Sequence, residues 1–320
     1  MEKIGKNVVQ FIRIIIALAA YGFVAYRLKS VDWSDLTTTF SHFSSTTNLL
    51  LFFVFLFLMP VNWLLESQKW RIVLYEIENI NLTQALKAVW YGVVTGLLTP
   101  NRVGEPLGRM AMVSAENRGK AAFLAIFCGV SQQVVTLVVG VFGILHLMLK
   151  NKNFYQSVST NSLFFVGIFI ATTIFIILLF NFNLLVQFLQ ANKLVKKVLS
   201  DEQVNLKITL SKTVSVLTLS IFRYLIFSTQ FFLMLRILGM SSDFTSMFAA
   251  IFSTYLFTNI VPTISLSEAG VRAGFAITVF GLFSQNYLAV TLASFIIWGV
   301  NVGIPAVIAA WFPWFKRNAS

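Results

Sequence analysis

The residues of this sequence that could do chemistry are charged side chains inside two otherwise apolar stretches. The first stretch holds Arg102, Glu105 and Arg109, and the second holds Glu268 and Arg272. In each, an arginine follows a glutamate by four residues, so on a helix the two side chains lie one turn apart and can pair. Because guanidinium groups bind carboxylates and phosphates through parallel hydrogen bonds, the pattern predicts an anion-binding site with the glutamates as counter-ions. The alternative is that each pair is an internal salt bridge holding a kink in place.

Both stretches also contain residues that interrupt helices. Proline lacks a backbone donor and clashes with the preceding turn, so no continuous helix is expected through Pro100 or Pro262. Gly104 permits backbone conformations that other residues avoid, Pro106 suits the first turn of a new helix, and Gly270 lies inside the second motif. We therefore expect two short helices at each site. The break between them would expose backbone N–H groups that can also hold an anion.

The composition places these stretches in a membrane. Apolar residues make up 57% of the 320 residues and charged residues only 11%, and the mean hydropathy is +0.80. A soluble domain normally has about a quarter of its residues charged, so the solvent for this chain must be lipid. No polar stretch is long enough for a separate soluble domain, and we predict a single membrane domain over residues 1–320. An ionisable group inside a bilayer costs roughly 2.5–3.5 kcal/mol, so the charged motifs need a functional reason.

The charge balance and the rare residues narrow the function. The net charge of +12 comes mostly from short loops, a pattern that sets topology and attracts the anionic cytoplasmic leaflet, and no nucleic-acid partner is expected. Cys128 is the single cysteine, so we predict no disulfide, metal site or cofactor within one chain. The sequence contains no glycine-rich nucleotide loop, no His/Cys cluster and no aspartate inside an apolar run, which argues against an enzyme.

The apolar runs predict an all-α membrane protein with six crossing helices and two broken pairs of short helices. The crossing helices are expected at about residues 8–26, 48–65, 121–149, 162–180, 213–238 and 286–312. The broken pairs are expected at about 84–98 with 105–116, and at about 244–259 with 267–281. A polar connector, residues 181–212, contains an amphipathic piece at 184–199 that would lie on the cytoplasmic leaflet.

The loop charges predict that both broken pairs are re-entrant. If each pair returns to the side from which it entered, most loop lysines and arginines fall in the cytoplasm, whereas crossing pairs would divide them almost equally. The re-entrant arrangement puts both termini in the cytoplasm and makes residues 1–150 and 160–320 an inverted repeat, with broken pairs entering from opposite faces. Interrupted short helices paired in this way are typical of a transporter's binding site near the bilayer midplane.

Single charges elsewhere have simpler interpretations. Arg13 lies close enough to a cytoplasmic end to reach the interface. Arg223 lies deeper in its apolar run, and we expect it to pair with a motif glutamate or with an anionic substrate. Glu66 ends its apolar run and is expected at the membrane interface, while Lys69 and Arg71 follow it on a helix that continues into the cytoplasm.

Two motifs resemble those of a known family. The sequence Thr99-Pro-x-Arg-x-Gly-Glu-Pro, followed by Arg109, resembles a motif in the flippase-like membrane region of the lysylphosphatidylglycerol synthase family. Val261-Pro262 with Gly-Val-Arg at 270–272 is similar to a second motif, although the acidic residue here precedes Gly-Val-Arg instead of following it. The resemblance covers nearly the whole chain. It implies the lipid-translocating half of the family, without the soluble aminoacyl-transfer domain.

The motifs and the resemblance lead to three hypotheses. The first is a transporter or flippase of the plasma (inner) membrane that moves an anionic lipid or a polyprenyl-type lipid-linked headgroup, held by Arg223 and the arginines of both motifs. The second is a non-transporting accessory subunit that presents a lipid-linked substrate to a membrane enzyme. The third is an intramembrane transferase or hydrolase that uses a motif glutamate as its base.

Overall fold

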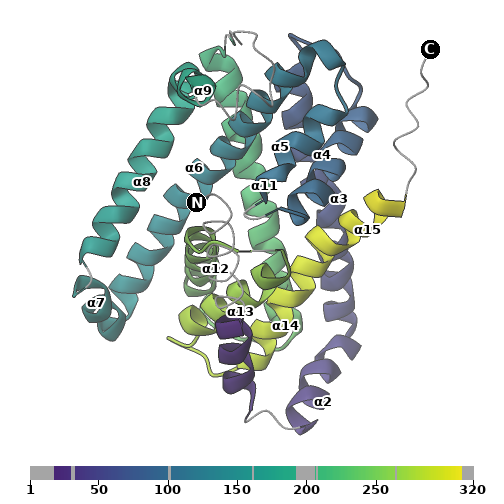
Figure 1. Cartoon of the computed structure of the whole chain (residues 1–320). Coiled ribbons are helices and arrows are strands. Elements are labelled where there is room, and N and C mark those ends of the chain that lie inside the picture. Colours follow the sequence, from purple (N-terminus) through teal and green to yellow (C-terminus); the bar gives the residue numbers. More distant parts are fainter. Residues whose placement is uncertain are drawn as a thin grey trace.

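The computed structural model describes residues 18–29, 33–99, 102–160, 162–191, 206, 208–263 and 265–311, and within these ranges the chain is helical without strands. Figure 1 shows the helices gathered into one bundle. After a helix at residues 18–28, the α-helices are α2 (Trp33–Ser41), α3 (Thr46–Leu74), α4 (Leu82–Leu97), α5 (Gly104–Ala111), α6 (Arg118–Lys150), α7 (Lys152–Ser159), α8 (Ser162–Phe180), α9 (Phe182–Ala191), α11 (Leu210–Ile237), α12 (Phe244–Ile260), α13 (Ser265–Phe280), α14 (Tyr287–Trp298) and α15 (Ile304–Trp311). The other elements are the turns His42–Ser44 and Ala115–Asn117, and a π-helical turn, Gly299–Gly303, that joins α14 to α15.

Helices α3 and α11 pack along each other. In addition, α6 packs against α12, and α15 packs against α4. Their apolar residues contribute to two large buried clusters, one around Tyr224, Phe231 and Tyr255 and the other around Trp70 and Phe127. The outward faces are also apolar, with many exposed leucine, isoleucine and phenylalanine side chains. A helix that is apolar on all sides needs lipid as its outer solvent.

Four described helices are long and apolar enough to cross a membrane: Thr46–Leu74, Ala115–Lys150, Leu210–Ile237 and Tyr287–Trp311. The segments Phe165–Phe180 and Phe182–Phe188 make a fifth candidate, although they are bent by 95° at the break between them. These helices correspond to five of the predicted crossings, and most of the remaining one, residues 8–26, lies outside the described residues. The chain is a membrane protein, and the count of six crossings stays a prediction.

Both predicted breaks are present. Helices α4 and α5 are separated by residues 98–103, and α12 and α13 by residues 261–264. Pro262 is exposed in the second break, whereas Pro100 lies outside the described residues. In Figure 1 the α4–α5 pair lies toward one end of the bundle, and the α12–α13 pair lies toward the other.

Threonine and glycine side chains hold α5 closely against α4. Thr99 Oγ1 accepts a hydrogen bond from Gly104 N at 2.7 Å, and Thr95 Oγ1 donates one to Gly104 O at 2.9 Å. Gly108 lies against the backbone of Gly92, and a Cβ atom on Gly108 would overlap the Thr95 hydroxyl. The two short helices therefore meet backbone to backbone, a close approach that only glycine allows.

Polar side chains fix the ends of the short helices. The carboxylate of Glu78 accepts hydrogen bonds from Ser114 N at 2.9 Å and Ser114 Oγ at 2.5 Å, and this anchor turns the chain away from the axis of α5. As a result, α5 ends before the predicted limit near residue 116. At the start of α12, hydrogen bonds from the Thr245 hydroxyl and from Ser246 lower the pKa of the Asp243 carboxyl to about 2.

The predicted amphipathic piece of the connector begins as α9. Phe182 and Val186 are buried against the bundle, whereas Leu184 and Phe188 are exposed. The rest of the 184–199 piece, from residue 192 onward, lies outside the described residues. Its expected contact with the anionic leaflet stays a prediction.

Candidate functional site

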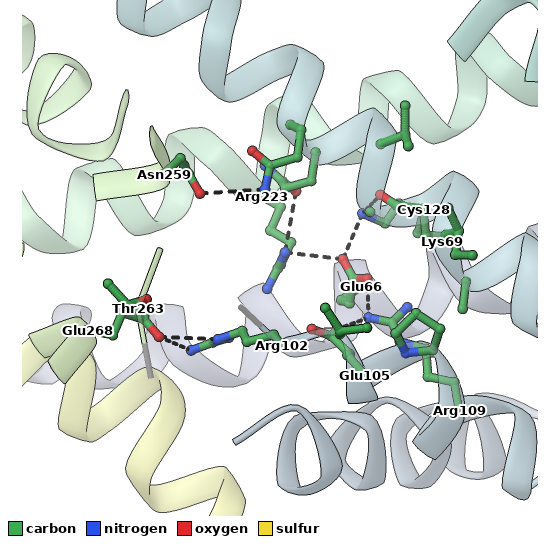
Figure 2. Close-up of a pocket in the computed structure, with 18 of the residues that line it drawn as sticks. Glu66, Lys69, Arg102, Glu105, Arg109, Cys128, Arg223, Asn259, Thr263 and Glu268 are labelled. Carbon is green, nitrogen blue, oxygen red and sulfur yellow. Dashed lines mark hydrogen bonds and ion pairs between the residues drawn. The ribbon is translucent and has the colours of Figure 1, made fainter. Parts of the chain in front are cut away.

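A cavity of about 940 Å³ lies inside the bundle and is lined by residues of α3, α5, α6, α8, α11, α12 and α13. Part of its wall is apolar, and the rest carries charge. The charged residues that line it are Glu66, Lys69, Arg102, Glu105, Arg109, Arg223, Glu268 and Arg272. Figure 2 shows most of these side chains converging from separate helices on one open space.

Glu66 organises the first group of charges, although its side chain is only 3% exposed. Its carboxylate lies 2.8 Å from Lys69 Nζ, 2.7 Å from Arg109 Nη2 and 3.3 Å from Arg223 Nη1. The same Arg109 nitrogen lies 2.5 Å from Glu105 Oε1. We call Glu66, Lys69, Glu105, Arg109 and Arg223 the Glu66 centre. It ties together α3, α5 and α11, which are distant in the sequence.

Neutral oxygens orient two cations of the Glu66 centre. Lys69 Nζ donates to the carbonyl oxygen of Cys128 and to Ser220 Oγ, both at 3.3 Å. Arg223 Nη1 donates to Gln132 Oε1 at 3.3 Å. In Figure 2 the other terminal nitrogen of Arg223 points into the open middle of the cavity. Lys69 is therefore locked into the protein, while Arg223 keeps a donor available to a ligand.

Glu268 organises the second group of charges, which joins the two broken segments. Arg102 Nε and Nη2 donate to Glu268 Oε2 at 3.2 and 2.9 Å, and Arg272 Nη2 donates to Glu268 Oε1 at 2.6 Å. We call Arg102, Glu268 and Arg272 the Glu268 centre. Arg102 holds this position with a backbone φ of 56°, a left-handed conformation that is rare for a residue with a side chain.

Several guanidinium nitrogens at this site are buried without a hydrogen-bond partner among the described residues. They are Nε and Nη1 of Arg109, Nε of Arg223 and Nε of Arg272. A buried donor left unpaired costs about 1–3 kcal/mol, and more when the group is charged. Each of these three arginines lines the cavity through other atoms of its side chain, because the unpaired nitrogens themselves have almost no accessible surface. The protein thus leaves donors of these arginines without a partner of its own.

The charges of the cavity do not balance. Five cations and three carboxylates line it, which leaves a formal net charge of +2. Uncompensated positive charge away from water is unfavourable, and an anion entering the cavity would relieve it. The site can therefore bind an anion through hydrogen bonds from its arginine side chains.

All six charged residues predicted for the site line this cavity, and they come from both broken segments and from α11. The predicted pairs Glu105–Arg109 and Glu268–Arg272 both form. Arg102, expected to be available in the break, contacts Glu268 of the other motif. Pairing within each motif follows from helical spacing, whereas this contact between motifs depends on how the two breaks face each other.

The structure places three single charges in contacts that the sequence does not predict. The carboxylate that Arg223 contacts is Glu66, not a motif glutamate, and its predicted contact with an anionic substrate stays a prediction. Glu66 is buried among cations of α3, α5 and α11, and α3 continues past it. The helix also continues past Lys69 as predicted, but the Lys69 side chain is only 1% exposed inside the Glu66 centre. The signal that could have found both residues is their spacing of three on one helical face, which lets them pair.

The residues predicted to shape the breaks have different roles. Pro106 lines the cavity at the first turn of α5. Gly104 is enclosed by Thr95 and Thr99, where a Cβ atom would overlap them. Gly270 lies against the ring of Tyr21, so its small size allows the helix at residues 18–28 to pack on α13.

The fold and the cavity together define a multi-helix membrane protein in which two broken helical segments enclose a charged internal space. The chain belongs to the family described as the lysylphosphatidylglycerol synthase TM region, whose model matches residues 10–310 of the 320. The match spans both motifs and every charged residue of the cavity. Among curated proteins, none matches the sequence significantly.

Proposed function

We propose that this protein is a transporter or flippase that moves an anionic lipid, or the anionic headgroup of a lipid-linked molecule, across the membrane. The observation that carries the proposal is the net charge of +2 in a cavity between apolar helices. Arginine donors without hydrogen-bond partners in such surroundings favour a functional ligand, although the same arginines also contact aromatic rings. The name of the family, which refers to an enzyme of lipid synthesis, supports a lipid as that ligand.

The apolar wall of the cavity supports a lipid rather than a free anion. Leu107 of α5, Ile126 and Val130 of α6, and Phe175 of α8 line the cavity together with the arginines. A headgroup could bind the charged groups while its acyl or polyprenyl chain lies along these apolar residues. Ligand sites with mostly apolar walls and a few placed polar groups are typical of such amphipathic ligands.

The packing of the helices supports a two-fold repeat, which the proposed inverted arrangement requires. A repeat relating residues 1–150 to 160–320 would pair α3 with α11, α4 with α12 and α6 with α14–α15. The contact of α6 with α12 would then have its counterpart in the contact of α15 with α4, and both occur. The broken pairs would enter from opposite faces, and rocking of one repeat against the other would alternate access to the site.

The ion pairs favour binding over catalysis at the motif glutamates. Glu105 contacts Arg109, and Glu268 contacts both Arg102 and Arg272. A carboxylate held in ion pairs with arginine is already engaged by those donors and is not free to accept a proton from a substrate. We therefore propose counter-ion roles for these residues and no enzymatic step.

The proposal is tested by lipid transport in liposomes containing the purified chain. Arg223→Gln and Arg272→Gln each remove one ligand donor yet leave every glutamate with at least one cation. We expect either change to slow headgroup translocation at least about tenfold, which corresponds to about 1.4 kcal/mol in the barrier. The control is Lys152→Gln, which removes an exposed cation on α7. Transport by both arginine variants at the rate of the control would refute the site assignment.

A complete absence of lipid movement in the unmodified protein would refute the transport step itself. If a lipid still bound to the cavity in that case, the accessory-subunit hypothesis would explain the result, because presentation of a lipid requires binding without translocation. Plasma-membrane location and cytoplasmic termini belong to the same proposal.

A further inference from the structure

The charged residues of the cavity form two separate centres. In the Glu66 centre, Lys69, Arg109 and Arg223 face Glu66 and Glu105, so one positive charge is left over. In the Glu268 centre, Arg102 and Arg272 face Glu268 alone, so again one positive charge is left over. No ion pair among the described residues joins the two centres.

Each centre also has unused donors of its own. In the Glu66 centre these are Nε and Nη1 of Arg109, which is 3% exposed, and Nε of Arg223. In the Glu268 centre it is Nε of Arg272, whose side chain is 12% exposed. The excess charge and the unpaired donors therefore coincide at both places. The arginine side chains remain partly accessible, 19% for Arg223 and 12% for Arg272, so each place can take one anionic group through charge-assisted hydrogen bonds.

We propose that the headgroup carried by this protein has two phosphate charges, one bound at the Glu66 centre and one at the Glu268 centre. The inference rests on the proposed function and makes its substrate class more specific. Two kinds of lipid have this chemistry: a polyprenyl lipid with a diphosphate, and a lipid whose two phosphates are bridged by glycerol. A lipid with a single phosphodiester charge would leave one centre uncompensated.

The position of the two centres gives the second phosphate a mechanical role. The Glu268 centre joins Arg102 of the first break to α13 after the second break. A phosphate at this centre competes with Glu268 for the guanidinium groups of Arg102 and Arg272. It would therefore weaken the Arg102–Glu268 contact between the two broken segments, while its own negative charge takes the place of the carboxylate. A one-phosphate lipid held at the Glu66 centre would leave that contact intact.

The test is lipid binding to the purified full chain, measured by native mass spectrometry or by displacement of a fluorescent lipid in nanodiscs. Four probes are compared: a glycerol-bridged diphosphatidyl lipid, a polyprenyl diphosphate, a phosphatidylglycerol and a polyprenyl monophosphate. We expect one of the two-phosphate lipids to bind at least about tenfold more tightly than its one-phosphate counterpart, about 1.4 kcal/mol. The pair of probes that shows the preference, glycerophospholipid or polyprenyl, identifies which kind of lipid the protein binds.

Charge variants tie the preference to the two centres. Arg223→Gln and Arg272→Gln each make one centre neutral, and either should lower the preference for the second phosphate to about twofold or less. Glu105→Gln adds a positive charge to the Glu66 centre and should increase the affinity for two-phosphate lipids. Arg223→Lys keeps the charge, should retain the preference, and shows that loss in Arg223→Gln is not a folding defect.

Equal affinity for one-phosphate and two-phosphate lipids would overturn the inference, and so would a preference that survives both neutralising variants. These outcomes are separate from failure of the proposed function. Transport of a one-phosphate lipid without any binding preference would leave the function standing and remove the inference. A binding preference without transport would leave the two-phosphate site standing and remove the transport function.

Discussion

Glu66 contacts three cations from three helices, so at the scale of single residues it is the group on which the Glu66 centre depends most. Removing one partner from a buried ionic network is costly, because the remaining charges have lost both water and their counter-ion. Exposed pairs behave differently, because water and salt replace the missing partner. The two situations occur in this one chain and can be compared directly.

We expect Glu66→Gln to lower the free energy of unfolding by about 3–5 kcal/mol, the range seen when a buried ion pair loses one partner. The matched change is Glu76→Gln, which breaks the contact of Glu76 with Lys212 at 2.7 Å, where the glutamate side chain is 53% exposed. That change should cost about 0–1 kcal/mol. Thermal unfolding in detergent, followed by tryptophan fluorescence, measures both. Equal losses of stability in the two variants would contradict the inference that the Glu66 centre depends most on Glu66.

At this scale the sequence predicts which residues are charged inside the membrane, but not how all of them pair. Glu105–Arg109 and Glu268–Arg272 follow from helical spacing alone. The contact of Arg223 with Glu66 joins residues on α11 and α3, and no local pattern encodes it. Glu66 also looks like a helix end in the sequence, because hydropathy falls after it although the helix does not stop.

At the scale of elements, the close contact of α4 with α5 sets where Glu105 and Arg109 lie. The break itself is predictable, because proline and glycine act on their own stretch of backbone. The length of α5 is not, since its end depends on Glu78 from the loop before α4 binding Ser114. Local signals therefore locate the short helices, while contacts from elsewhere in the chain decide their extent.

Gly108→Ala tests the contact between these two helices. The added Cβ would overlap Thr95 Oγ1 and the backbone of Gly92, so we expect a loss of about 1–3 kcal/mol in stability, as for other overpacked sites. Gly167→Ala on α8 is the matched change, because nothing lies within 4 Å of its Cβ position. That variant should be neutral or more stable by up to about 1 kcal/mol, from helix propensity. Thermal unfolding should show a lower melting temperature for Gly108→Ala and an unchanged or higher one for Gly167→Ala. An equal decrease in both variants would argue against the close contact.

At the scale of the whole molecule, the Arg102–Glu268 contact is the place where the two broken segments meet across the cavity. In an inverted repeat these segments belong to different halves, so the contact would have to break when one half moves relative to the other. An ion pair suits this position, because a bound anion can take over the arginine as the glutamate is released. Closure and ligand binding would then use the same side chains.

Labelling from each side of the membrane decides whether the halves are inverted. In a Cys128→Ser background, we place single cysteines at Glu116, before α6, and at Gln285, before α14, both of which are exposed. These positions correspond to each other in the two halves, and the inverted repeat therefore predicts that a membrane-impermeant maleimide labels Glu116→Cys from the cytoplasmic side and Gln285→Cys from the opposite side. Labelling of both from one side would make the repeat parallel. The two broken segments would then enter from the same face, and a cavity between them could not be opened alternately to both sides by rocking the halves.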